Sequence, residues 1–136
     1  MISKKLFLGV ILLTVFFVCL GCTSTANFAM VDSSPVQVSM FVFDDTNKLM
    51  FSEVNDFNAG SSAFDVVKEL LGGNLEYQEY SFGVMITSIY GVDASSEDYW
   101  ALYVDGNYAS KGISDYVVNN PTLIEWRLEK ISAFSS

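Results

Sequence analysis

The ten residues from Tyr99 to Tyr108, Tyr-Trp-Ala-Leu-Tyr-Val-Asp-Gly-Asn-Tyr, decide the fold of this chain. They place four aromatic side chains around the pair Asp105-Gly106. Such a pair between two alternating runs is typical of a β-hairpin, because a two-residue type I′ turn needs positive φ at both central positions. Side chains alternate along a strand, so the first arm divides into a core set and an outer set. The core set is Trp100, Leu102 and Val104, and the outer set is Tyr99, Ala101 and Tyr103.

Further strands are expected on both sides of this hairpin, from runs that alternate between apolar and polar residues. They cover 36–43, 48–57, 75–80, 81–91 and 121–131. In the second run we expect Leu49, Phe51 and Val54 to face inward. Gly83 inside the fourth run indicates a bulge or a close backbone approach.

One helix is expected between the second and third strands. Ser62 with Asp65 resembles a capping box, and Gly72-Gly73 supplies the left-handed residue that commonly ends a helix. The apolar side chains between these signals form one stripe, as in a helix that packs on a core: Ala63, Phe64, Val66, Val67, Leu70 and Leu71. The order of elements predicts an α+β domain of the β-grasp type, with a mixed sheet and one helix packed across one face.

The first 21 residues have the pattern of a signal peptide. Lys4 and Lys5 precede an apolar run over 6–20, and Gly21-Cys22 follows. This end resembles the lipobox of bacterial-type lipoproteins, in which the cysteine becomes the lipidated first residue of the mature chain; Cys19 stands where that motif usually has Leu, Val or Ile. We predict a signal peptide over 1–21 and lipidation of Cys22, with an uncleaved anchor or plain secretion as the alternatives. A flexible tether over 22–35, a domain over 36–131 and a tail over 132–136 complete the expected organisation.

The net negative charge of the chain restricts the classes of partner that it can bind. The chain has 16 acidic and seven basic residues, and cleavage before Cys22 leaves five basic residues and a net charge of −11. Such a surface repels nucleic acid and anionic lipid head groups, so a lipid anchor would have to hold the protein at the extracytoplasmic face of the membrane. Cys19 leaves with the signal peptide and Cys22 carries the lipid, so no internal disulfide is expected.

No catalytic or metal-binding set is visible in the sequence. The chain contains no histidine and keeps no free thiol, which excludes His-based acid-base chemistry and cysteine nucleophiles. The pair Asp44-Asp45 lacks the ligand spacing of a calcium loop, so we interpret it as a solvated turn. Asp93, Glu97 and Asp98 in loop 92–98 are possible calcium ligands, but a charged surface loop explains them better. We therefore predict that the protein is not an enzyme, needs no cofactor and holds no metal.

Five segments, taken in order, resemble the C-terminal domain of the transcobalamin and intrinsic-factor carriers and its microbial relatives. The resemblance covers 36–131 and rests on 60–68, 81–91, 99–106, 112–116 and 123–128. In those carriers this domain closes over cobalamin bound against a separate helical barrel. This chain departs from them in two respects: it has no barrel, and it has Asn119-Asn120-Pro121 where relatives commonly have an acidic turn.

The resemblance makes a corrinoid such as cobalamin the leading candidate ligand. The Tyr99-Trp100 pair and the loop 112–116 match the carriers, and strand alternation adds the exposed tyrosines of the hairpin. The predicted ligand-binding residues are Tyr99, Trp100, Tyr103, Tyr108, Ile113 and Tyr116. For Trp100 and Trp126, a place in the core is a better explanation than ligand contact.

Two functions fit these features. The first is a lipid-anchored, extracytoplasmic binding module for a soluble ligand, because clustered aromatic side chains offer flat apolar area with polar tips. The second is an interaction module whose aromatic face docks a transporter or another envelope protein, because the same residue types dominate protein interfaces.

Overall fold

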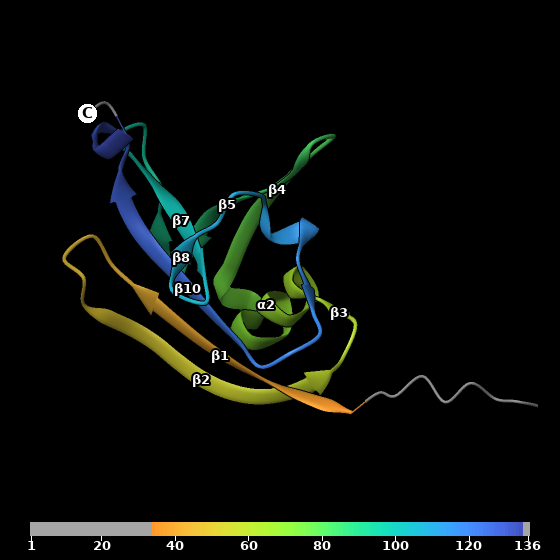
Figure 1. Cartoon of the computed structure of the whole chain (residues 1–136). Coiled ribbons are helices and arrows are strands. Elements are labelled where there is room, and N and C mark those ends of the chain that lie inside the picture. Colours follow the sequence, from red (N-terminus) through yellow and green to blue (C-terminus); the bar gives the residue numbers. More distant parts are fainter. Residues whose placement is uncertain (1–33, 135–136) are drawn as a thin grey trace, which may run out of the picture. The chain divides into compact units, whose positions relative to one another are not determined.

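A five-stranded mixed sheet forms the base of the fold in the computed structural model, which describes residues 34–134 (Figure 1). The strand order is β2-β1-β10-β7-β8. Strand β1 pairs with β10 in parallel, and the other neighbours pair antiparallel. The bounds are β1 Pro35–Phe43, β2 Leu49–Asn58, β7 Asp98–Val104, β8 Asn107–Tyr108 and β10 Thr122–Lys130.

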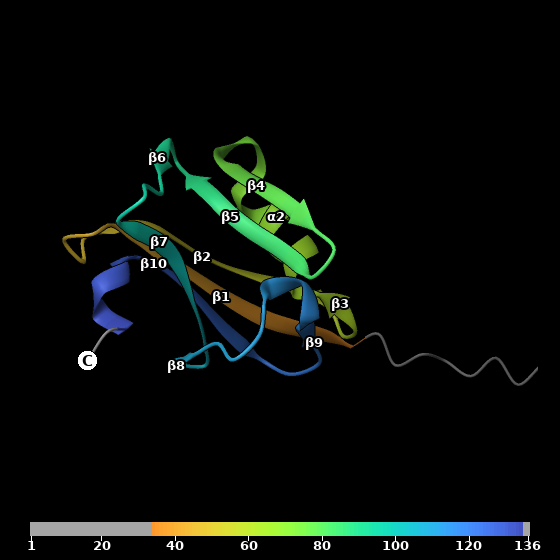
Figure 2. The ribbon, with the colours of Figure 1, turned by 90° about the horizontal axis from the view of Figure 1, so that it is seen from above.

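Helix α2, Ala63–Leu71, lies on one face of this sheet (Figures 1 and 2). It begins after Ser62, whose backbone is extended but whose side chain makes no capping hydrogen bond, so only the position of the predicted cap is right. It ends at Gly72, where φ is +53°. All six predicted apolar positions of the helix are buried. A mixed sheet with one helix on one face confirms the predicted α+β class.

Two smaller sheets complete the described part of the chain. Strand β3, Ser61–Ser62, pairs with β9, Val117–Val118, while β4, β5 and β6 form a three-stranded sheet beside α2 (Figure 2). The bounds of this sheet are β4 Leu75–Tyr80, β5 Gly83–Ile89 and β6 Val92–Asp93. The described residues also contain three short 3-10 helices: η1 Gly72–Asn74 between α2 and β4, η2 Ile113–Asp115 between β8 and β9, and η3 Ile131–Phe134 after β10.

The core lies between the large sheet and α2. Val38, Met40 and Val42 of β1 are fully buried, together with Ile124 of the neighbouring β10. Partners in register point to the same side of a sheet, so the pairing of Trp126 with Leu102 brings the hairpin's core set onto this face.

The predicted burial of β2 is wrong at two of three positions. Leu49 and Val54 are 47% and 52% exposed, while Phe51 is half-buried against the core. Val54 pairs with Ser39 and therefore lies on the side of the sheet away from α2. The apolar pattern of an edge strand does not fix which of its residues face the core. In β2, the pairing with β1 decides which side chains lie on the side of α2.

The hairpin turn has the predicted geometry. Asp105 and Gly106 adopt φ values of +52° and +79°. The turn is also tied to β10, because the Asp105 N–H donates to the Leu123 carbonyl and the Leu123 N–H donates to Asp105 Oδ1. This reciprocal pair holds β7 and β8 in position at the edge of the sheet.

The predicted signal peptide, Cys22 and most of the tether lie outside the described residues. Within 34–134, no helix is both long enough and apolar enough to cross a membrane.

Candidate functional site

A cavity of about 920 Å³ lies between the β7–β8 end of the large sheet and strand β5. This volume is in the range of small-molecule binding sites. One wall comes from β5, a second from the sheet, and a third from the segment 108–113 that follows the hairpin. Gly83, at the start of β5, adopts φ +140°, and a Cβ there would lie 3.4 Å from Ser114 Oγ. A Cβ at that distance would be in ordinary van der Waals contact, so the backbone conformation, and not a lack of space, favours glycine here.

Two tryptophans and a leucine form the sheet wall of the cavity: Trp100, Leu102 and Trp126. The Trp100 Nε1–H donates to the Val92 carbonyl at 3.2 Å, which fixes the orientation of this ring. Trp126 is 3% exposed, and its Nε1–H has no partner among the described residues. The wall is thus apolar, and its three side chains are largely buried.

The mouth of the cavity carries exposed apolar side chains from the β4–β5 hairpin. Phe82 is 76% exposed and stacks on Tyr80 with ring centres 5.0 Å apart and planes 9° apart. Met85 is 51% exposed and also lines the cavity. Together with the tryptophan wall, these side chains present apolar surface to two sides of the space.

The edge of β7 is open where it borders the cavity. Strand β8 pairs only with Tyr103 and Val104, and beyond them the Ala109 N–H donates to the Leu102 carbonyl. Alternate residues of an antiparallel strand direct their backbone groups to the same side, so Trp100 directs its N–H and C=O away from β10, as Leu102 does. No described strand pairs with this N–H and C=O, which therefore lie at the edge of the sheet beside the indole ring.

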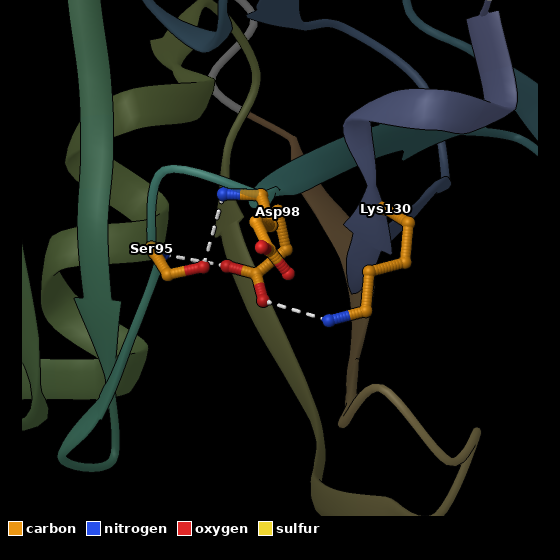
Figure 3. Close-up of polar contacts among 4 residues, drawn as sticks. Ser95, Asp98 and Lys130 are labelled. Carbon is orange, nitrogen blue, oxygen red and sulfur yellow. Dashed lines mark hydrogen bonds and ion pairs between the residues drawn. The ribbon is translucent and has the colours of Figure 1, made fainter.

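One carboxylate lines the cavity, and its charge is compensated (Figure 3). Asp98 Oδ1 accepts from the Ser95 N–H at 2.5 Å, and Oδ2 lies 3.3 Å from Lys130 Nζ. These contacts, led by the backbone bond from Ser95, hold the pKa of Asp98 below its usual value. Asp98 thus ties the β6–β7 loop to the end of β10.

One lysine, Lys111, lines the cavity as well. Lys111 Nζ donates to the Asp115 carbonyl at 2.7 Å and lies 4.5 Å from the centre of the Tyr116 ring. Both contacts are with neutral groups, and no carboxylate forms an ion pair with Lys111 among the residues described.

The opposite face of the large sheet carries a second aromatic cluster, which we call the outer cluster: Phe43, Tyr103, Arg127 and Glu129. The Arg127 guanidinium lies 5.1 Å from the ring centres of both Phe43 and Tyr103. Glu129 accepts hydrogen bonds from Tyr103 Oη at 2.7 Å and from Tyr99 Oη at 3.3 Å. The bond to Glu129 raises the pKa of Tyr103, and burial, followed by hydrogen bonding with Tyr108, raises the pKa of Tyr99.

Four of the six predicted ligand-binding residues line the cavity: Tyr99, Trp100, Tyr108 and Ile113. Tyr103 belongs to the outer cluster instead, and Tyr116 lines a separate cavity of about 260 Å³ near β9. Sequence reasoning did not select the β5 wall or Lys111 as ligand contacts. The unusual run of exposed apolar residues around Gly83 is the signal that could have indicated this wall.

The acidic turns hold no cluster of metal ligands in the described part of the chain, where no group of three or more His, Cys, Asp or Glu side chains converges. In the 44–48 turn, Asp44 Oδ1 instead accepts from the Thr46 N–H, the Thr46 hydroxyl and the Lys48 N–H. The carboxylate is thereby used to close the turn.

Comparison with known proteins shows one family match and several structural relatives. Residues 60–130, more than half of the chain, match the family described as Domain of unknown function (DUF4430). No curated protein matches the sequence.

Two solved structures are similar in fold. One, from Ruminococcus gnavus ATCC 29149, is described as "a putative metal binding protein"; it is 14% identical over 70% of this chain and 97% of its own, with a TM-score of 0.56. The other is haptocorrin in complex with cobinamide (Cbi), 27% identical over 81% of this chain, with a TM-score of 0.59. The match covers 28% of the haptocorrin chain. It confirms the predicted transcobalamin-like fold.

Proposed function

The chain belongs to the DUF4430 family, and we propose that it is a non-catalytic binding module that takes up a soluble, partly planar ligand in the cavity beside β7. A corrinoid is the leading candidate. The observation that carries this proposal is the 920 Å³ cavity walled by Trp100 and Trp126, because flat aromatic surface in a preformed cavity suits a planar ligand.

The open edge of β7 supports the choice of ligand class. The rim of a corrinoid carries amide groups, which need both donors and acceptors. The backbone N–H and C=O of Trp100 lie at this unpaired edge, next to the ring that would contact the planar part of the ligand. A ligand with an apolar plane and polar rim would satisfy both features of the wall.

The haptocorrin comparison supports the same class and limits the affinity. Haptocorrin is in complex with cobinamide, and this chain corresponds to just over a quarter of it. The exposed Phe82 and Met85 indicate that the mouth of the cavity is open to solvent. A half-enclosed site retains only part of the binding energy, so we expect a dissociation constant of about tens of micromolar or weaker unless a partner protein supplies the other wall.

We further propose the β-grasp topology and a lipid anchor at the extracytoplasmic face of the membrane. The parallel pairing of β1 with β10 at the centre of a sheet that carries a single helix supports the topology. The Gly21-Cys22 pattern after an apolar run supports the anchor.

Calorimetry with the purified full chain tests the ligand. We expect cobalamin to bind and to quench the fluorescence of Trp100 and Trp126, which are the two tryptophans of the chain. No heat and no quenching at about 1 mM corrinoid would contradict the corrinoid assignment.

That negative result would favour the second candidate function, in which the exposed Tyr80–Phe82 stack docks an envelope protein. The anchor is tested separately with Cys22→Ser. Release of the variant from the membrane, with a change in gel mobility, is expected; unchanged membrane attachment and mobility would argue against lipidation.

A further inference from the structure

The two charged groups that line the cavity differ in how their charges are balanced. Asp98 has Lys130 and the Ser95 N–H as partners, whereas Lys111 contacts only a carbonyl oxygen and a ring. Of these two lining residues, only Asp98 has an ion-pair partner among the described residues, and the chain as a whole carries a net charge of −9. A cation without an ion pair is unexpected in a chain with such an excess of carboxylates.

We infer that the ligand carries an oxyanion, such as a carboxylate or phosphate, that contacts the ammonium group of Lys111. This inference rests on the proposed function, since it specifies the ligand of the same cavity. The ligand class becomes a planar, partly apolar molecule with one acidic group at its rim.

The position of Lys111 supports this assignment. Its Nζ carries three N–H donors, and the Asp115 carbonyl uses one of them. The face of Tyr116 stabilises the charge without neutralising it, because the ring carries no net charge. Lys111 is exposed, so its remaining donors are free to serve an anion that enters the cavity.

The other lysines and the arginine provide the contrast. Lys68 pairs with Asp65 at 2.7 Å, Arg127 with Glu125 at 3.1 Å and Lys130 with Asp98 at 3.3 Å. Among the described cations, Lys48 shares with Lys111 the lack of an ion pair, but it lies in the exposed 44–48 turn and lines neither cavity. Lys48 is therefore the matched control for a general effect of charge.

Two probes with the same ring system test the inference on the full chain. 8-Anilino-1-naphthalenesulfonate carries a sulfonate, and N-phenyl-1-naphthylamine lacks it. Quenching of Trp100 and Trp126, which both line the cavity, gives the dissociation constant of each probe. For each probe, the dissociation constant of the variant is divided by that of the unsubstituted chain. The measured quantity is this factor for the anionic probe divided by the same factor for the neutral probe.

For Lys111→Met we expect this ratio to be about five, the size of a partly exposed charge interaction. We expect a ratio near one for Lys48→Met and for Lys111→Arg, which keeps the charge. A ratio near one for Lys111→Met, or the same rise for Lys48→Met, would overturn the inference while leaving the cavity as a binding site. If neither probe quenched the tryptophans of the unsubstituted chain, the proposed function itself would be overturned, and this inference with it.

Discussion

The two faces of the large sheet are both rich in aromatic residues, yet they differ in what those residues contact. On the side of α2, Trp100 and Trp126 border a cavity. On the other side, Tyr103 contacts Arg127 through its ring and Glu129 through its hydroxyl group. Aromatic composition alone therefore does not mark a binding surface: a ring whose face and polar tip already have partners in the chain has little left to offer a ligand.

Tyr99 shows how closely the two regions adjoin. Its hydroxyl donates to Glu129 of the outer cluster, while other atoms of the residue line the cavity. The short strand β8 leaves the edge of β7 uncovered there, so the cavity reaches around the edge of the sheet. The comparison can be tested by removing groups from one side at a time.

The largest effect is expected on the cavity side. Trp126→Ala should lower the free energy of unfolding by about 3–5 kcal/mol, because it removes a large buried side chain at the centre of β10. Denaturant unfolding followed by circular dichroism measures this loss. A loss below about 1 kcal/mol would show that the wall carries little of the core's packing energy.

A smaller effect is expected in the outer cluster. Glu129→Gln should lower the free energy of unfolding by about 1 kcal/mol, because two tyrosine hydroxyls lose a charged acceptor. Glu125→Gln is the control on the same face, since Glu125 pairs with Arg127 and bonds to neither hydroxyl. Equal losses in the two variants, measured by the same unfolding assay, would contradict the special role of Glu129.

Titration at high pH provides a further test of the outer cluster. The pKa values of Tyr99 and Tyr103 are raised in the folded protein, so the folded state keeps these two phenol protons at pH values above 10, where the unfolded state loses them. The two tyrosines therefore contribute their full stabilisation below pH 10. The contribution is lost as the pH rises from 10 through the folded pKa values. Absorbance at about 295 nm should show a late fraction of phenols that shrinks in Tyr103→Phe. An absorbance titration that is unchanged in Tyr103→Phe would contradict the raised pKa of Tyr103.

The smallest effect on stability is expected at the mouth of the cavity. Phe82→Ala should change the free energy of unfolding by less than about 0.5 kcal/mol, because the ring is 76% exposed. It should nevertheless weaken corrinoid binding severalfold in calorimetry, since the ring forms part of the apolar rim. Unchanged affinity would restrict the site to the tryptophan wall.

Much of the fold followed from local patterns in the sequence. The turn at Asp105-Gly106, the helix between Ser62 and Gly72 and the alternation along β7 and β10 are each set by backbone preferences and by the period of apolar residues. These signals act over a few residues, so they can be read without the rest of the chain. Together with the resemblance to the carriers, they selected four residues that line the cavity.

Only the tertiary structure decided which of the remaining residues share a surface. The exposure of Val54 depends on its pairing with Ser39, and the place of Tyr103 in the outer cluster depends on Glu129, 26 residues away. The β5 wall and Lys111 reach the cavity because β5 packs beside η2. Local sequence determines the type of each element, whereas the partners of a side chain depend on contacts between distant segments, which no local pattern encodes.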